Sequence, residues 1–178
     1  MDYFFELFFS GLTRGSIYAL IAVGYTMVYG IIELINFAHG EIYMIGAFTA
    51  LVVAGVLTAL GFPALAILAI ALAAAIIWSA AYGFTVEKIA YKPLRGAPRL
   101  SPLISAIGMS IFLQNYVMLA QTPDFLPFPR LMPELPLGPL QNYIGSSGVF
   151  IILATAVSCA GLTLFIKFTR MGKAMRAT

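Results

Sequence analysis

Several stretches of this chain stay apolar for about the length that a membrane-spanning helix needs. At a rise of about 1.5 Å per residue, roughly 20 apolar residues cross the ~30 Å hydrocarbon core of a bilayer. Lipid offers the backbone no hydrogen-bond partners, so such stretches are expected to be helices. The sequence therefore predicts an all-α, polytopic transmembrane helix bundle. The expected spans cover residues 11–32, 42–60, 64–86, 100–121 and 148–168.

The composition excludes a soluble domain. The chain has 178 residues, of which 61% are hydrophobic and 10% are charged, whereas soluble domains carry about 25% charged residues. A soluble fold of this size must still cover itself with polar atoms. The net charge of +3 does not indicate a nucleic-acid partner, because the basic residues lie beside the ends of apolar runs. The single cysteine, Cys159, excludes an internal disulfide and is read as a packing residue.

The basic residues predict how the chain is oriented in the membrane. They gather between the third and fourth spans and after the fifth span, and cytoplasmic loops carry such an excess. This assignment puts the N-terminus outside the cytoplasm, although Arg14 fits that position poorly. The two clusters consist of Lys88, Lys92, Arg95 and Arg99, and of Lys167, Arg170, Lys173 and Arg176.

The connection between the fourth and fifth spans, residues 122–145, is rich in proline. Proline blocks both regular helix and strand pairing, so an ordered coil on the outer membrane surface is expected. Apolar side chains such as Phe125, Leu126 and Phe128 would dip into lipid or cover a partner. The prolines are Pro123, Pro127, Pro129, Pro133, Pro136 and Pro139.

Small residues recur at four-residue spacing on two of the expected helices. Gly11 and Gly15 form one pair, and Gly46, Ala50 and Ala54 form a longer row. Small residues let helix backbones approach closely in lipid. These faces therefore predict helix packing and carry no information about function.

Polar residues interrupt the apolar sequence between the first two spans. They include Glu33, Asn36, His39 and Glu41. On a continuous helix Glu33 and Asn36 would share one face. Alternatively, the helix breaks near Asn36, which then caps the second span, and broken helices at membrane depth are common in transporters. The carboxylates are either buried and functional or simply located at the headgroup boundary.

Residue types offer little support for an enzyme. His39 and Glu41 stand at i and i+2, which is poor geometry for a metal pair on a helix, and the chain has no other histidine. The sequence contains neither a G-x-S-x-G nucleophile turn nor a G-x-x-x-x-G-K-S/T phosphate loop. No catalytic residue, metal or cofactor is expected. A membrane enzyme working through Glu33, His39 and Glu41 stays the competing interpretation.

The fourth span carries polar side chains inside an apolar helix. Ser105 and Ser110 are expected to hydrogen-bond their own helix. Gln114 and Asn115 need partners in lipid. We expect these two amides to bond neighbouring helices rather than to line a hydrophilic path.

Segments in a fixed order carry a resemblance to a known family. Residues 15–30 (GSIYALIAVGYTMVYG) and 35–41 (INFAHGE) resemble the opening of LivH-type permeases of branched-chain amino acid ABC importers. Residues 86–95 (VEKIAYKPLR) and 103–115 (LISAIGMSIFLQN) resemble the next signature of that family. Residues 168–177 (FTRMGKAMRA) resemble the entry to its cytoplasmic coupling region.

The resemblance implies a multi-pass subunit of the cell inner membrane that imports Leu, Ile or Val. Its implied partners are a second, LivM-like permease, two ABC ATPase subunits that hold the ATPase activity, and a periplasmic substrate-binding protein. Urea and short-chain amide importers share this permease type, and a stand-alone secondary transporter is a further alternative. Such permeases are longer, so residues 1–178 are expected to be the N-terminal part of one truncated permease domain.

Two groups of residues are expected to carry function. Asn36, His39 and Glu41 are assigned to the substrate pathway or its gate. The resemblance places Arg170, Gly172 and Arg176 on the side that faces the ATPase.

Overall fold

The computed structural model describes residues 2–32, 35–94, 96–98, 100–124, 126–129, 131 and 145–175. Regular structure in these ranges is helical throughout, so the predicted all-α class is confirmed. Five helices in these ranges are long and apolar enough to cross a membrane, as expected.

The chain divides into two compact units. The first unit combines Met1–Glu33 with Met132–Thr178, and the second is Leu34–Leu131. The assignment of residues 1–178 to one permease domain stays a prediction. Glu33 and much of the proline-rich connection lie outside the described residues.

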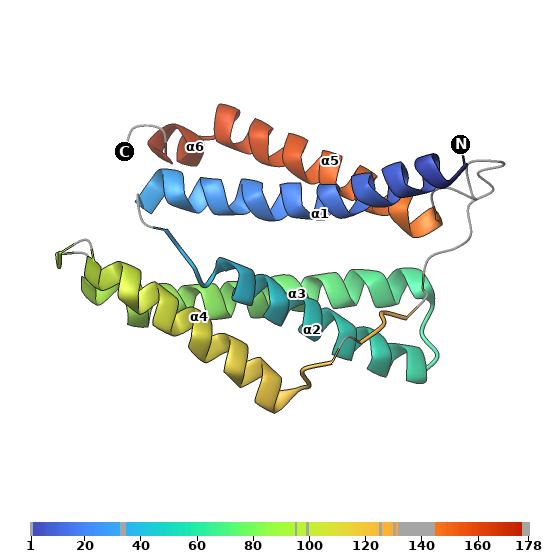
Figure 1. The fold of residues 1–178 in the computed structure, drawn as a ribbon, viewed down its shortest axis with the longest axis horizontal. Helices are drawn as coiled ribbons and strands as arrows, with labels where there is room; N and C mark the ends of the chain where they lie inside the picture. The colour runs from blue at the N-terminus through green and yellow to red at the C-terminus, as the bar shows by residue number, and fades with distance from the viewer. Residues whose placement is uncertain are drawn as a thin grey trace. The chain divides into compact units, whose positions relative to one another are not determined.

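The first unit pairs α1 (Asp2–Ile32) with α5 (Ser146–Phe168), which lie alongside each other (Figure 1). Helix α1 begins at Asp2 rather than near residue 11, because residues 2–10 contain no helix breaker. The Phe4 and Phe8 rings, one turn apart, stack at a centroid distance of 6.4 Å and support the added turns. Helix α5 is followed by the short helix α6 (Arg170–Met175).

The second unit begins with an antiparallel pair, α2 (His39–Ala59) and α3 (Ala64–Val86). The turn between them is a Schellman motif, in which the Phe62 N–H bonds the Leu57 carbonyl at 3.2 Å and the Gly61 N–H bonds the Thr58 carbonyl at 3.1 Å. Gly61 has φ 76°, a left-handed conformation that glycine adopts without a Cβ clash. Pro63 then precedes α3 with extended backbone. The expected break at these residues therefore has a clear physical cause.

Small residues on α2 make the close approach to α3 that their spacing predicts. Gly46 is buried, and a Cβ built there would overlap the Ser79 hydroxyl of α3. Ala54 is also buried and packs with Ile67 and Ala71. The other predicted pair differs, because Gly11 and Gly15 on α1 have no atom within 4 Å of such a Cβ.

The α-helical hydrogen bonding of α3 ends at Val86. The helix continues as a π-helix, η1 (Glu87–Tyr91), and a 3₁₀ turn, η2 (Lys92–Leu94). Pro93 follows the π turn, has no N–H, and its ring would crowd the carbonyl four residues earlier in an α-helix. The chain avoids this clash by widening the turn, so that the Lys92 N–H bonds the Glu87 carbonyl.

Helix α4 (Leu100–Ala120) packs against both α2 and η1 and completes the second unit. The core of this unit lies where these elements meet. Its buried residues are Ala38, Ile45, Val86, Ala90, Tyr91, Ala106, Leu113 and Val117.

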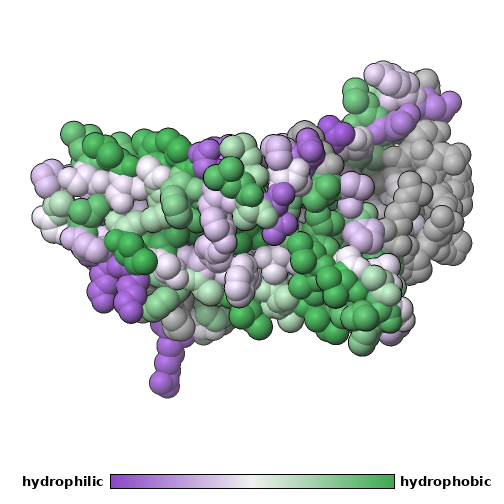
Figure 2. All heavy atoms as spheres, turned by 90° about the horizontal axis from the view of Figure 1, so that it is seen from below, coloured by the Kyte–Doolittle hydropathy of each residue, from purple (hydrophilic) through white to green (hydrophobic). Residues whose placement is uncertain are grey.

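The outer surfaces of both units are apolar. Large hydrophobic side chains are exposed on every long helix, as Phe4, Leu65 and Leu119 illustrate. Figure 2 shows patches of apolar side chains on one face, with more polar side chains between them. Lipid, rather than water, is the solvent that suits such surfaces.

Candidate functional site

Asn36 organises the turn that leads into α2. Its Oδ1 accepts a hydrogen bond from the Ala38 N–H at 3.1 Å, and its carbonyl accepts one from the His39 N–H at 3.2 Å. The residue at the N-cap of α2 is Ala38, and no side chain caps that helix. The helix does break near Asn36, so the continuous-helix alternative is wrong here. Capping by Asn36 is also wrong, because its side chain closes an Asx turn before the helix instead.

Tyr91 fixes this turn from a distant part of the chain. Its hydroxyl donates to Asn36 Oδ1 at 2.7 Å, across a separation of 55 residues. Tyr91 closes the π-helix, is only 8% exposed, and belongs to the same core cluster as Ala38. Tyr91 carries no signal of this role in the sequence, because its neighbours are typical of an ordinary basic cytoplasmic loop.

Glu41 links the first turn of α2 to α4. Its Oε1 accepts a hydrogen bond from the Ser110 hydroxyl at 3.0 Å. Ser110 lies midway along α4, so the half-buried Glu41 carboxylate is far from either end of that helix. Burying a carboxylate in such a position costs free energy unless the group is hydrogen-bonded or has a function.

His39 is the first residue of α2 and is half-buried. Asn36, His39 and Glu41 therefore occupy one short stretch, from the Asx turn to the first turn of α2. Among the described residues, no group of three or more His, Cys, Asp or Glu side chains comes together as a metal site would require.

The polar residues of α4 behave differently from the prediction. Ser105 donates to the Ala90 carbonyl of η1 at 3.1 Å, and Ser110 reaches Glu41, so both serines bond across elements. Asn115 instead donates to the Ile111 carbonyl of its own helix at 2.8 Å. The expected roles of the serines and of Asn115 were thus reversed.

The second predicted group lies in the first unit, at the corner between α5 and α6. Thr169 separates the helices and is extended. Its Oγ1 donates to the Phe165 carbonyl at 2.7 Å and accepts from the Gly172 N–H at 3.0 Å. The hydroxyl therefore ends one helix and caps the next.

Gly172 allows this corner to be tight. It is buried, and a Cβ built there would overlap the backbone of Ile166. Arg170 is exposed as the first residue of α6. Arg176 lies outside the described residues.

Residues 7–178 match the protein family described as "Branched-chain amino acid transport system / permease component". The chain belongs to this family. The resemblance to LivH-type permeases is thereby confirmed, and the five candidate spans together with the family make the chain a multi-pass membrane protein. A family of permease components gives no support to the membrane-enzyme interpretation of Glu33, His39 and Glu41.

Individual members of the permease family are similar over nearly the whole chain. The chain is 48% identical over 180 residues to the high-affinity branched-chain amino acid transport system permease protein BraD of Pseudomonas aeruginosa, a match that covers 94% of this chain. It is 46% identical to LivH of Salmonella typhimurium and 44% identical to LivH of Escherichia coli K12, with 98% of this chain covered. The chain spans 56% to 58% of the length of these relatives. No solved structure matches it significantly.

Proposed function

We propose that this chain is a permease subunit of an ATP-driven importer of branched-chain amino acids in the cell inner membrane. The match of residues 7–178 to the permease family carries this proposal. The relatives BraD and LivH are named as permeases of high-affinity branched-chain amino acid transport systems. The proposal extends that function to this chain.

The importer would contain further subunits. A second, LivM-like permease would complete the pathway, two ABC ATPase subunits would supply the energy, and a periplasmic binding protein would deliver the substrate. ATP hydrolysis belongs to the partner subunits in this scheme. This permease contributes to the pathway and transmits the movement of the ATPases.

The stretch from Asn36 to Glu41 is the proposed pathway or gate element. Two hydrogen bonds support this role, one from Tyr91 to Asn36 and one from Ser110 to Glu41. They join the start of α2 to both η1 and α4, so a shift of either element would move the turn. If these hydrogen bonds break and re-form, the turn before α2 can adopt two discrete arrangements relative to η1 and α4.

The corner at Thr169 is the proposed ATPase-facing element. Arg170 and Arg176 would contact the ATPase, and Gly172 would keep α6 packed tightly against the end of α5. The steric overlap that a Cβ would cause at Gly172 supports the tight packing of α6 against α5. A tight corner transmits displacement better than a loose linker, because packed elements do not deform continuously.

Uptake in cells tests the proposed function. The full-length permease would be expressed with its partner genes in a bacterial strain that lacks its own leucine importers. Uptake of radiolabelled leucine is expected, and a catalytically inactive ATPase should abolish it. Uptake of urea or short-chain amides without leucine would instead support the related importer class. Leucine uptake that persists with the inactive ATPase would favour a secondary transporter.

A further inference from the structure

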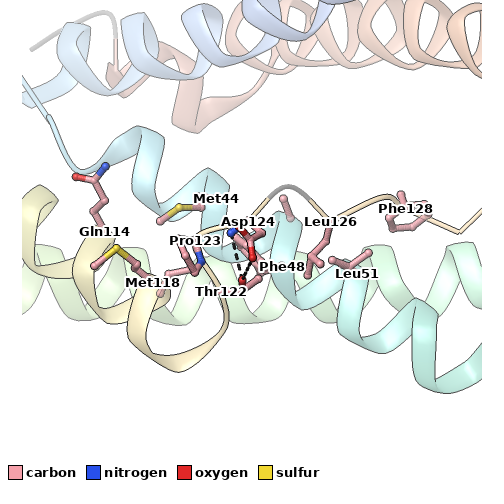
Figure 3. Close-up of a pocket in the computed structure, with 12 residues that line it drawn as sticks. Met44, Phe48, Leu51, Gln114, Met118, Thr122, Pro123, Asp124, Leu126 and Phe128 are labelled. Atoms are coloured by element: carbon pink, nitrogen blue, oxygen red, sulfur yellow. Dashed lines mark hydrogen bonds between the residues drawn. The ribbon is translucent and has the colours of Figure 1, made fainter.

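The second unit contains a cavity of about 550 Å³ between α2, α4 and the segment that follows α4 (Figure 3). Small-molecule pockets have volumes of roughly 300–1,000 Å³. The walls are mainly apolar and include Met44, Phe48 and Leu51 from α2, and Met118 from α4. None of the residues in the predicted site lines this cavity, so it is a separate feature of the same unit.

A single carboxylate interrupts the apolar lining. Asp124 is the charged member of the described lining residues, and the other polar members are Gln114 and Thr122. The Thr122 hydroxyl donates to Asp124 Oδ2 at 3.3 Å and accepts from the Asp124 N–H at 3.2 Å. These reciprocal bonds hold the carboxylate against the cavity, as the dashed lines in Figure 3 show.

The chemistry of the lining selects one class of ligand. A carboxylate beside apolar walls favours a cationic donor, and charge-assisted hydrogen bonds are about twice as strong as neutral ones. Apolar walls favour a hydrocarbon side chain and disfavour a charged one. The Gln114 amide can donate to a second, anionic group. A zwitterion with an apolar side chain meets all three requirements.

We propose that this cavity binds an apolar α-amino acid, with Asp124 accepting from its ammonium group. Met44, Phe48 and Met118 would contact the side chain, and Gln114 would donate to the carboxylate. In Figure 3, Gln114 lies at one end of the lining, Asp124 in the middle, and Leu126 and Phe128 at the other end. The inference rests on the proposed function.

The location of the cavity suits the arrival of substrate. The distribution of basic residues places the C-terminal end of α4 on the outer side of the membrane. The lining residues that follow α4 therefore lie near that side. A binding protein would release its amino acid on that side. The cavity would then be the first binding site within this permease, ahead of the turn at Asn36.

Direct binding to the assembled importer tests the site. The full-length permease complex would be placed in lipid nanodiscs without its binding protein, and radiolabelled leucine binding would be measured. The competitor 3-methylbutylamine, which lacks the carboxylate, is expected to displace leucine. The competitor 4-methylpentanoate, which lacks the ammonium group, is expected to displace it poorly. Equal competition by both compounds would overturn the proposed role of Asp124.

Substitutions make the test specific. Asp124→Asn keeps an oxygen for the Thr122 hydroxyl but removes the charge, and should weaken leucine binding about tenfold or more. Ala47→Phe puts a ring into the cavity from an exposed position on α2 and should weaken leucine binding by filling the space. Glu6→Gln makes the same chemical change at an exposed site on α1 and should leave binding unchanged.

The outcomes separate this site from the proposed function. Normal leucine binding by both Asp124→Asn and Ala47→Phe, in a complex that still takes up leucine with ATP, would overturn the site and leave the function standing. A wild-type complex that neither binds nor takes up leucine would overturn the function and the site together. Weakened binding in both variants, with Glu6→Gln unaffected, supports the site.

Discussion

The hydroxyl of Tyr91 donates a 2.7 Å hydrogen bond to Oδ1 of Asn36, and so joins the π turn after α3 to the turn before α2. The same Asn36 oxygen also accepts from the Ala38 N–H. One side-chain oxygen therefore holds both the local turn and its long-range contact.

Tyr91→Phe should lower the free energy of unfolding without changing the fold. The ring stays in the core, but the donor to Asn36 is lost, which costs about 1–2 kcal/mol of unfolding free energy. Denaturation of the purified permease in detergent, followed by circular dichroism, measures the change. Tyr43→Phe is the matched control, because Tyr43 is 48% exposed on α2. Equal effects of the two substitutions would contradict the assigned role of Tyr91.

Glu41→Gln should impair uptake but preserve assembly. The glutamine carbonyl can still accept from Ser110, so the link between α2 and α4 survives while the negative charge disappears. We expect leucine uptake to fall about tenfold or more, because hydrogen bonds to a charged group are stronger than those to a neutral one, with the amount of purified complex unchanged. Normal uptake kinetics would remove Glu41 from the pathway.

The contribution of the Glu41–Ser110 bond to stability can be measured separately. A double-mutant cycle with Glu41→Ala and Ser110→Ala should give a coupling of about 0.5–3 kcal/mol, as for other residues in direct contact. Thermal denaturation of the four proteins supplies the values. Additive effects would show that the hydrogen bond contributes nothing measurable.

Gly46→Ala should loosen the pairing of α2 with α3. The new methyl group would overlap the Ser79 hydroxyl, and overpacking of this kind costs about 1–3 kcal/mol. Adding Ser79→Ala removes the obstructing oxygen and should restore most of the lost stability. Gly55→Ala on the same helix is the control, because nothing lies within 4 Å of its added Cβ. A Gly46→Ala protein as stable as Gly55→Ala would refute the close approach.

Gly172→Ala should disturb the corner between α5 and α6. Its Cβ would overlap the Ile166 backbone, which cannot rotate away as a side chain can. We expect less ATPase to co-purify with the permease, and Arg176→Glu should have a similar effect through charge. Gly161→Ala on α5 has open space around the added Cβ and serves as the control. Unchanged ATPase recovery with both variants would argue against the coupling role.

Properties that depend on local sequence were predictable. Apolar length alone indicated five helices, because a lipid environment leaves few other structures. The gap between the expected spans 42–60 and 64–86 coincides with the turn at Gly61 and Pro63, since left-handed backbone and a missing N–H act within a few residues. The spacing of Gly46 and Ala54 likewise predicted a packing face.

Contacts between distant polar residues were not predictable. Ser110 meets Glu41 across 69 residues, and Tyr91 meets Asn36 across 55. These partners depend on how the helices cross and on the extra residue that the π turn inserts near Pro93. A short hydroxyl reached a neighbouring helix where two backbones are close, whereas the longer Asn115 amide folded back onto its own helix. Side-chain type alone could not determine that outcome.

ATP-dependent uptake into proteoliposomes tests the central claim most directly. The full-length permease would be purified with its second permease and ATPases, reconstituted, and supplied with leucine-loaded binding protein outside and ATP inside. The proposal predicts accumulation of leucine that requires both ATP and the binding protein. A well-assembled complex that hydrolyses ATP but accumulates no branched-chain amino acid would contradict it.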